Sequence, residues 1–465
     1  MTPTVADWET LQRAIASSVV LPGSPDYDLV RKPAMARFEN VRPEAVVLCG
    51  TPEDVSAAIA FARRVGLQTA VRSGGHSVAG RSSTVGMVID VTPMSSISVD
   101  GEVATVGTGV RLGALYDTLQ EHGLTIPAGC GPDVGIAGLT LGGGIGILGR
   151  KYGLTCDNLL QAEVVLADGR VVECDEHRDE ELFWALRGAG GGNFGVVTSF
   201  VFRTLPAPMA TVFHLVWPLA QAAAVAQGWQ AWAPTGPDEL DATLRMTAPG
   251  EQPPVVELVG AVVGTEADAA KLLEELIALA GADPASASHR PMPYREAKRY
   301  LNELEAGDDQ DEQAAPDQPP QQGHLFTKSE FFQRPLPIET IAALVENLTR
   351  RLAPGQSREV TFLPWGGAYN RVRADATAFV HRGELFLIQH LLIIEPDASA
   401  TESEAARDWL TRSWALVHPS GSGGVYPNFP DPDLDDGAHA YYGKNRDRLL
   451  RIKANYDPDN FFGFR

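Results

Sequence analysis

The stretch Val71-Arg-Ser-Gly-Gly-His-Ser-Val-Ala-Gly80 indicates the fold of this chain most directly. An apolar run leads the chain into a loop of small residues with one histidine, His76, at its centre. Gly74 and Gly75 carry no side chain, so the backbone N–H groups of the loop can turn inward and approach a ligand closely. The charged and hydroxyl side chains beside them are Arg72, Ser73 and Ser77. The loop therefore suits a diphosphate, with a plain glycine-rich surface turn as the alternative.

Composition and charge are those of an ordinary globular protein. The chain has 465 residues, of which 44% are hydrophobic and 21% charged, and its net charge is −21. An acidic balance argues against nucleic acid or an anionic membrane as a partner, because either would need a basic face. No apolar run approaches the roughly 20 residues that span a bilayer. The N-terminus lacks the apolar segment of a signal peptide, so we expect a cytoplasmic protein. The sequence leaves open whether it is a monomer or a homodimer.

The cysteine pattern indicates neither a disulfide framework nor a metal site. No C-x-x-C pair occurs, and no histidine lies at zinc-ligand spacing from a cysteine. The four cysteines are Cys49, Cys130, Cys156 and Cys174. We expect reduced thiols and no bound metal.

Glycine is unusually dense between residues 127 and 158, and this density favours a backbone wall against a ligand over a stable helix or strand. Gly144, Gly146 and Gly149 also spell G-x-G-x-x-G, with Asp168 about 20 residues further on. That match is weak, because no apolar strand precedes it and no apolar-faced helix follows it. A nicotinamide dehydrogenase using these glycines is therefore only an alternative.

The residue composition and the pattern of apolar positions change near Pro206 and again near His418. Between them, strand-like runs alternate with longer helices, as in a sheet covered by helices on one face. The runs expected as strands are Thr211–Trp217, Ala242–Met246, Val255–Val263 and Glu384–Ile394. The acidic, proline- and glutamine-rich stretch Glu303–Gln322 predicts a mobile loop. The last 45 residues or so regain the glycine, proline and aromatic density of the first part.

Several motifs in this order resemble one family along nearly the whole chain. They are Arg72-Ser-Gly-Gly-His76-Ser, Val134-Gly-Ile-Ala-Gly-Leu-Thr-Leu-Gly-Gly-Gly144, Arg150-Lys-Tyr-Gly-Leu-Thr-Cys-Asp-Asn158-Leu, Leu182-Phe-Trp-Ala-Leu-Arg-Gly188 with Gly192-Asn-Phe-Gly-Val-Val197, Tyr426-Pro-Asn-Phe429, and Tyr442-Gly-Lys-Asn445 with Tyr456-Asp-Pro-Asp-Asn-Phe461. Together they resemble the berberine-bridge-enzyme-like FAD-linked oxidases, whose FAD domain is of the vanillyl-alcohol-oxidase (PCMH) type.

The resemblance implies a two-domain α+β fold with FAD as cofactor. A split FAD-binding domain, residues 1–205 and 419–465, would enclose a substrate-binding domain, residues 206–418, built on an antiparallel sheet covered by helices. His76 would be bonded to the 8α carbon of the flavin. The other predicted FAD contacts are Arg72, Ser73, Gly74, Gly75, Ser77, Gly135, Gly138, Gly142, Gly143, Gly144, Gly146, Asn193, Gly195, Val197 and Asn428.

Two positions depart from the family pattern. Relatives with a second flavin link carry a cysteine where this chain has Gly131, and Cys130 lies one residue earlier. A one-residue slip in an extended segment turns the side chain to the other face, so a second link through Cys130 is disfavoured. Many relatives have a tyrosine base at the position of Phe429, which has no ionisable group. The candidates to replace it are Tyr426, Tyr369 and Glu359, with Tyr441 and His381 also open.

The resemblance implies an oxidase that takes hydride from a C–OH or C–N centre of a small molecule and passes the electrons to O2. We expect a tailoring enzyme of bacterial secondary metabolism. Oligosaccharides and nicotine-type amines are alternative substrates on this scaffold. A flavoprotein that binds a metabolite without turnover is the alternative from another class, which Phe429 leaves open.

Overall fold

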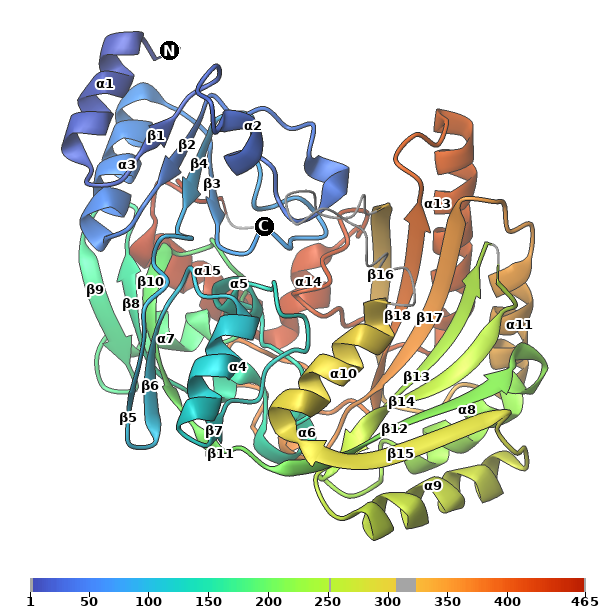
Figure 1. The fold of residues 1–465 in the computed structure, drawn as a ribbon. Coiled ribbons are helices and arrows are strands. Elements are labelled where there is room, and N and C mark those ends of the chain that lie inside the picture. Colours follow the sequence, from blue (N-terminus) through green and yellow to red (C-terminus); the bar gives the residue numbers. More distant parts are fainter. Residues whose placement is uncertain (1–2, 251, 307–322, 464–465) are drawn as a thin grey trace.

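The computed structural model describes residues 3–250, 252–306 and 323–463. In Figure 1 these residues form two lobes that face each other. The first lobe holds a four-stranded and a five-stranded sheet, and the second holds a seven-stranded sheet. The predicted class, a two-domain α+β fold, is confirmed.

The four-stranded sheet of the first lobe delivers the chain to the His76 loop. Its strands are β1 (Val19–Val20), β2 (Ala45–Leu48), β3 (Thr69–Arg72) and β4 (Met87–Asp90), and β2 and β3 both pair with β4 in parallel. Helix α3 (Pro52–Val65) connects β2 to β3, with α1 (Val5–Ala14) packed beside it. The Thr51 hydroxyl caps the N-terminus of α3, and Gly66 ends the helix in the left-handed conformation that glycine adopts readily.

The five-stranded sheet is antiparallel, in the order β5-β6-β10-β8-β9. Its strands are β5 (Ile97–Asp100), β6 (Val103–Gly107), β8 (Leu159–Val165), β9 (Val171–Asp175) and β10 (Val196–Arg203). Helices α4 (Leu112–Glu121) and α7 (Glu180–Leu186) belong to the same lobe, with the short pair β7 (Leu124–Thr125) and β11 (Leu205–Pro206). Asp168 and Gly169 lie in the turn that joins β8 to β9.

The glycine-rich segment is not entirely irregular, which corrects the prediction from propensity. It contains two short helices, α5 (Ile136–Leu141) and α6 (Gly149–Tyr152). Tertiary packing outweighs the helix cost of glycine here, because Ile136 and Leu141 are buried in the main apolar core of the first lobe. The stretch between the two helices remains an extended backbone wall.

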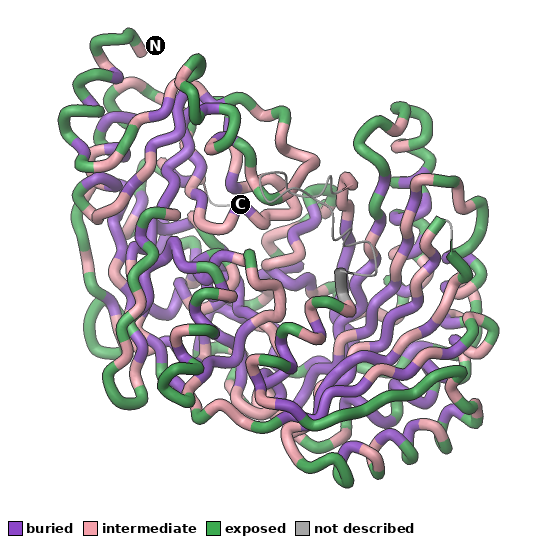
Figure 2. Tube along the Cα trace, viewed as in Figure 1, coloured by how far each residue is buried: buried purple, intermediate pink, exposed green. Residues whose placement is uncertain are grey.

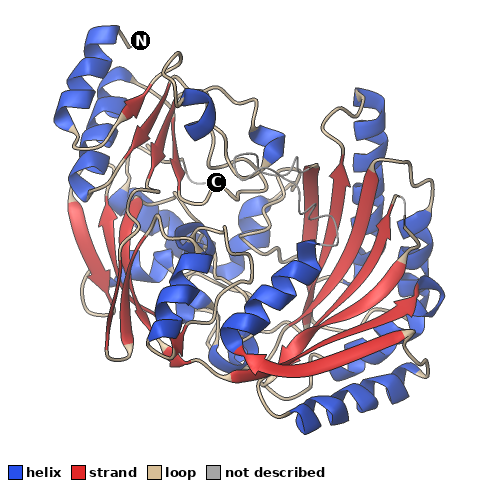
Figure 3. Ribbon diagram, viewed as in Figure 1, coloured by secondary structure: helices blue, strands red, loops and turns tan. Residues whose placement is uncertain are grey.

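The second lobe is a seven-stranded antiparallel sheet in the order β15-β12-β14-β13-β17-β18-β16. The strands are β12 (Met209–Pro218), β13 (Leu240–Pro249), β14 (Val255–Val262), β15 (Ser286–Pro293), β16 (His324–Phe332), β17 (Gln356–Pro364) and β18 (Phe386–Ile394). Four were predicted, and β15, β16 and β17 were not. The outer face is covered by α8 (Ala222–Trp232), α9 (Glu266–Ala280), α11 (Ile338–Thr349) and α13 (Ala400–Val417), as Figure 3 shows.

One helix of the second lobe lies on the opposite face of the sheet. Helix α10 (Tyr294–Ala306) packs between the sheet and the first lobe, with Tyr294, Ala297 and Leu301 in the first lobe's core cluster (Figure 1). Of the predicted loop Glu303–Gln322, the residues up to Ala306 therefore continue this helix, and 307–322 lie outside the described residues.

The C-terminal segment returns to the first lobe. Helices α14 (Gly437–Tyr442) and α15 (Arg446–Tyr456) contribute Tyr441, Tyr442 and Leu449 to that lobe's core cluster. The Tyr442 hydroxyl donates to the Ala189 carbonyl at 2.9 Å. Buried residues run through the strands of both lobes in Figure 2. We retain the division into 1–205, 206–418 and 419–465 as a proposal that this return supports.

Candidate active site

A cavity of about 790 Å³ lies between the glycine loops of the first lobe and the inner face of the seven-stranded sheet. This volume is in the range typical of sites for small ligands and cofactors. Twelve of the predicted FAD contacts line it: Ser73, Gly74, Gly75, His76, Ser77, Gly135, Gly138, Gly146, Asn193, Gly195, Val197 and Asn428. Cys130 and the three candidate bases Glu359, Tyr369 and Tyr426 also line it. The fold thus brings together residues that are hundreds of positions apart.

Two glycines hold the His76 loop against the start of α5. A Cβ on Gly74 would overlap the backbone of Gly135, and a Cβ on Gly135 would overlap the backbone of Gly74. The Ser73 hydroxyl donates to the Thr108 carbonyl at 2.7 Å, which fixes the loop to the end of β6. These glycines are needed for the close approach of two backbones, as well as for access to a ligand.

His76 is half-buried at the cavity wall. Burial lowers the pKa of His76 below its ordinary value, while the nearby Asp133 carboxylate acts in the opposite direction. The ring is therefore neutral at neutral pH, and one nitrogen keeps a free lone pair. Among the described residues its Nε2 atom has no hydrogen-bond partner. An imidazole in this state can form a bond to carbon.

Arg72, which the sequence predicts as an FAD contact, points into the protein and not into the cavity. Its guanidinium is buried and donates to the carbonyls of Val30 at 2.8 Å and Ser82 at 3.1 Å, with Asp90 at 4.0 Å. It is not among the described residues that line the cavity. Through these bonds to the Val30 and Ser82 carbonyls the Arg72 side chain holds the neighbouring backbone in place.

Gly142, Gly143 and Gly144 also lie behind the wall, outside the described cavity lining. A Cβ on Gly142 would overlap the amide of Asn428, and Gly143 has a φ of +120°, which favours glycine. The Gly144 N–H donates to the Tyr426 hydroxyl at 3.0 Å. Gly142 and Gly144 thus support the C-terminal segment, and the direct contact of the three glycines with FAD stays a prediction that the cavity lining does not support.

Two other glycines leave open space in the cavity wall. A Cβ built on Gly138 or Gly192 would meet no atom within 4 Å, and both residues line the cavity. Asn428 lies near them, donating to the Leu139 carbonyl at 2.9 Å and to the Tyr426 hydroxyl at 3.1 Å. The first lobe therefore provides a glycine cradle, hydroxyl and backbone donors, and a neutral histidine. This set fits a flavin dinucleotide.

The inner face of the sheet forms a polar floor opposite the glycine cradle. In the β-ladder, Arg245 pairs with Thr361 and Thr361 pairs with Gln389, so these side chains form a row across β13, β17 and β18. Glu359 lies two residues before Thr361 on the same face and accepts a short hydrogen bond from the Thr361 hydroxyl. Sequence reasoning identified only Glu359 among these.

Asp241 is a second acidic group on the floor that sequence reasoning missed. Burial raises the pKa of Asp241 to about 6, and Arg150 and Lys298 partly offset this effect. Asp241, Thr243 and Arg245 line the cavity from alternate positions of β13. This alternation is the signal that could have identified them, because three polar side chains at a spacing of two share one strand face.

The two candidate tyrosines have hydroxyls already bonded to the glycine wall. Burial raises the pKa of Tyr426 well above its ordinary value, although the Asn428 and Gly144 donors oppose the shift. Burial likewise raises the pKa of Tyr369, whose hydroxyl donates to the Gly146 carbonyl at 3.3 Å. Neither phenol is poised to lose a proton. Phe429, also on the cavity wall, packs edge-on against the Tyr426 ring, with centroids 5.0 Å apart.

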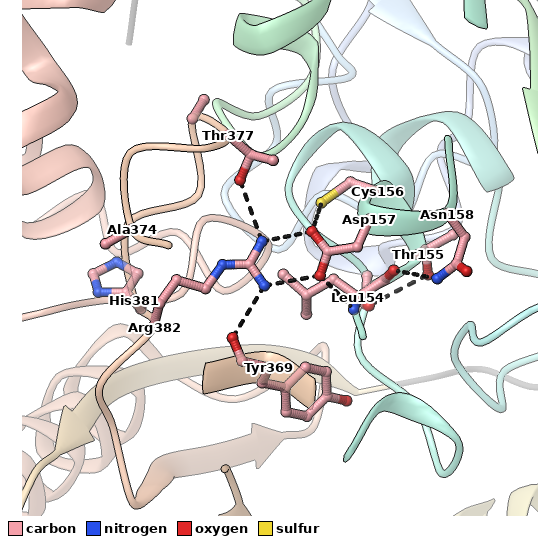
Figure 4. Close-up of polar contacts among 12 residues, drawn as sticks. Leu154, Thr155, Cys156, Asp157, Asn158, Tyr369, Ala374, Thr377, His381 and Arg382 are labelled. Carbon is pink, nitrogen blue, oxygen red and sulfur yellow. Dashed lines mark hydrogen bonds and ion pairs between the residues drawn. The ribbon is translucent and has the colours of Figure 1, made fainter. Parts of the chain in front are cut away.

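A buried ion pair fixes the second lobe against the first (Figure 4). Arg382 donates to the two carboxylate oxygens of Asp157 at 2.6 and 2.8 Å, and its side chain is 1% exposed. The same guanidinium donates to the Thr377 hydroxyl at 3.2 Å and to the Tyr369 carbonyl at 3.3 Å. Tyr369 lies on the short helix α12 (Ala368–Arg371). The pair thus determines where Tyr369 meets the glycine wall.

Arg150, at the other end of the same motif, also reaches into the second lobe. Its Nη1 atom donates to the carbonyls of Ala233 and Trp365, both at 2.7 Å, and its Nη2 atom donates to the Gly236 carbonyl at 2.8 Å. The motif Arg150–Asn158 therefore joins the lobes from both of its ends.

The G-x-G-x-x-G match does not form a dinucleotide fingerprint. Gly149 begins the four-residue helix α6, and a Cβ there would overlap the Tyr369 hydroxyl. Asp168 lies in the β8–β9 turn, where it accepts from Arg170 at 2.7 Å. No strand-turn-helix unit surrounds these glycines in the described chain. The alternative of a nicotinamide dehydrogenase therefore lacks the strand-turn-helix unit that its dinucleotide-binding motif requires.

Comparison with known proteins agrees with this site. The FAD binding domain model matches residues 43–175, and the berberine and berberine-like model matches residues 425–465. An uncharacterized FAD-linked oxidoreductase of Bacillus subtilis, YgaK, is 33% identical over 97% of this chain and 96% of its own. The structure of BBE-like 28 from Arabidopsis thaliana has a TM-score of 0.87 and 26% identity, covering 98% of each chain.

Glucooligosaccharide oxidase from Acremonium strictum, described with a 6-S-cysteinyl, 8α-N1-histidyl FAD, has a TM-score of 0.86 and 27% identity, again over 98% of each chain. The chain belongs to the berberine-bridge-enzyme-like family of FAD-linked oxidoreductases. It is therefore an FAD-dependent enzyme, as the sequence predicts.

Neither membrane nor metal features occur in the described part of the chain. No helix within residues 3–250, 252–306 and 323–463 has the length and apolarity needed to cross a bilayer. Over the same residues, no three His, Cys, Asp or Glu side chains are placed to hold a metal ion. Cys49, Cys156 and Cys174 are buried, and Cys130 is half-buried.

Proposed function

We propose that this protein is an oxidase with covalently bound FAD that oxidises a C–OH or C–N centre of a small molecule. The observation that carries the proposal is the cavity itself, whose lining includes His76 and the glycine cradle on one side and, on the other, the carboxylate of Glu359, which forms no ion pair with the described residues. When bound, FAD supplies a two-electron acceptor that can be reoxidised by O2. The protein residues bind, orient and shelter the reactants.

We propose that a ring nitrogen of His76 is bonded to the 8α carbon of the flavin. Two features support the link: the depressed pKa, which keeps the imidazole neutral, and the position of the ring on the cavity wall. A single link is retained. Cys130 lines the same cavity and is half-buried, but it lies one residue before the position that carries the linked cysteine in doubly linked relatives.

Among the three predicted bases, we propose Glu359 as the proton acceptor. The Glu359 carboxylate faces the cavity, whereas burial raises the pKa values of Tyr426 and Tyr369, whose hydroxyls are already hydrogen-bonded to the glycine wall. The Thr361 hydroxyl donates to Glu359 and so orients the carboxylate within the cavity. Tyr426 and Tyr369 instead hold the Gly144–Gly146 backbone in place.

The test is anaerobic reduction of the bound flavin by candidate substrates, followed at the flavin absorption band. Glu359→Gln should slow reduction by about 10²- to 10⁴-fold, the usual contribution of a general base. Tyr426→Phe should slow it much less. Glu346→Gln, an exposed exchange of the same kind on α11, is the control and should change nothing.

Three alternatives remain distinguishable by the same experiment. Reduction by oligosaccharides would give this chain the chemistry named for glucooligosaccharide oxidase, and reduction by nicotine-type amines would give it an amine chemistry. A flavin that no alcohol or amine reduces would favour the alternative in which the flavoprotein binds a metabolite without turnover. The expected role in intracellular bacterial secondary metabolism remains part of this proposal, and the Bacillus subtilis relatives support a bacterial setting.

A further inference from the structure

The inner face of the seven-stranded sheet changes from polar to apolar along its strands. On β18 the cavity-facing side chains are Gln389, Leu391 and Ile393, and on β16 Leu325 lies beside Ile393 in the β-ladder. Glu359 pairs with Leu391 and marks the border between the two zones. One end of the floor therefore offers hydrogen bonds, and the other offers hydrocarbon.

Exposure rises in the same direction, which identifies the apolar end as the mouth of the cavity. Gln389 is buried, Leu391 is half-buried and Ile393 is 42% exposed. Leu325, next to Ile393, is also half-buried, whereas Thr327 further along β16 is buried. Leu391, Ile393 and Leu325 therefore line the cavity between this exposed end and the polar row.

The wall opposite this mouth is apolar as well. Met35, Val78, Phe429 and Pro430 line the cavity from the first lobe. Phenylalanine at position 429 fits this setting, since a tyrosine hydroxyl would need a hydrogen-bond partner there. Ser357, paired with Ile393, supplies a hydroxyl at this end of β17. A chain of sugar rings in this part of the cavity would lay its hydroxyls against side chains that, apart from Ser357, offer few hydrogen bonds.

Resting on the proposed function, we infer that the substrate is an alcohol or amine whose reacting centre carries an apolar alkyl or aryl body. The polar head lies in the row of Arg245, Thr361 and Gln389 beside Glu359, and the body lies over Leu391 and Ile393. At about 3.3 Å per residue, the four steps from Gln389 to Ile393 span about 13 Å, and the two steps from Leu391 to Ile393 span about 7 Å. The body over Leu391 and Ile393 thus has the length of a medium alkyl chain or two fused rings.

The test is a titration of the purified holoprotein with n-alkanols and n-alkylamines from butyl to octyl, and with cello-oligosaccharides from glucose to cellotetraose. Binding is read from the perturbed flavin absorption and, independently, from thermal shift. We expect Kd to fall about threefold to fourfold for each added CH2, the factor corresponding to about 0.8 kcal/mol. Added glucose units should leave Kd unchanged.

A matched pair of variants locates the effect. Ile393→Asn should abolish the gain from the last methylenes, while Ile338→Asn, at a 48% exposed isoleucine outside the cavity, should not. A Kd that ignores alkyl length, or that falls with each glucose unit, would overturn the inference. Because thermal shift needs no flavin signal, a preparation without flavin would refute the proposed function and leave this inference still decidable.

Discussion

Replacement of Arg382 tests whether the Asp157–Arg382 pair joins the two lobes. The Asp157 side chain is 9% exposed and Arg382 is 1% exposed, so Arg382→Met leaves a carboxylate buried with the Leu154 N–H as its main remaining donor. Breaking a buried ion pair from one side costs about 3–5 kcal/mol. We expect the free energy of unfolding in urea, followed by tryptophan fluorescence, to fall by that amount.

The double variant makes this prediction sharper. Arg382→Met combined with Asp157→Leu removes both charges, so the loss should be smaller than the sum of the two single losses and close to that of one. Arg373→Met, which removes an exposed arginine paired with Asp375, is the control and should have no measurable effect. Additive losses, or a loss below about 1 kcal/mol for Arg382→Met, would refute the role of the pair.

Three further predictions concern the cavity. The pKa of Asp241 rises from 3.8 to about 6 on folding, so its ionisation destabilises the fold as the pH rises from about 4 to 6. Asp241→Asn should therefore add up to about 3 kcal/mol to the free energy of unfolding at pH 7.5 and almost nothing below pH 4. Gly138→Ala should lower flavin content in the purified protein while raising the stability of flavin-free chain by up to about 1 kcal/mol, since its Cβ enters the cavity from a helix. Gly142→Ala should lower stability by about 1–3 kcal/mol and shift the flavin spectrum, because it displaces the Asn428 amide; an unchanged spectrum would contradict the contact assigned to Asn428.

The glycine loops could be predicted because their residue type follows from the backbone geometry. Gly74 and Gly135 are required where two backbones approach closely, and this requirement is visible in the sequence as small residues at fixed spacing. The sequence does not show in which direction a side chain next to these glycines points. Arg72 was assigned to the ligand, yet its position at the end of β3 turns it into the protein.

The sequence pattern did not predict strands β15, β16 and β17, because polar residues interrupt the alternation of apolar and polar positions that indicates a strand. β17 presents Glu359 and Thr361 to the cavity, and on its other face Arg358 precedes the buried Val360 and Phe362 and donates to the carbonyls of Leu348 at 3.3 Å and Arg350 at 2.8 Å, so its apolar face is only two residues long before Pro364. The Asp157–Arg382 pair was equally hidden, since its members lie 225 positions apart and only the fold brings them together. Polar residues of the cavity and of the contact between the lobes thus occupy positions where an apolar pattern would predict core residues.

The bond between His76 and the flavin is the central claim of this account, and peptide mapping tests it most directly. Trypsin cleavage after Arg72 and Arg81 of the denatured protein releases the peptide Ser73–Arg81, which contains His76, and cleavage after Arg111 and Arg150 releases Leu112–Arg150, which contains Cys130. We predict that Ser73–Arg81 carries the visible flavin absorption and the added mass of one FAD, and that Leu112–Arg150 carries neither. Two unmodified peptides, or flavin on Leu112–Arg150 alone, would contradict the assignment of His76.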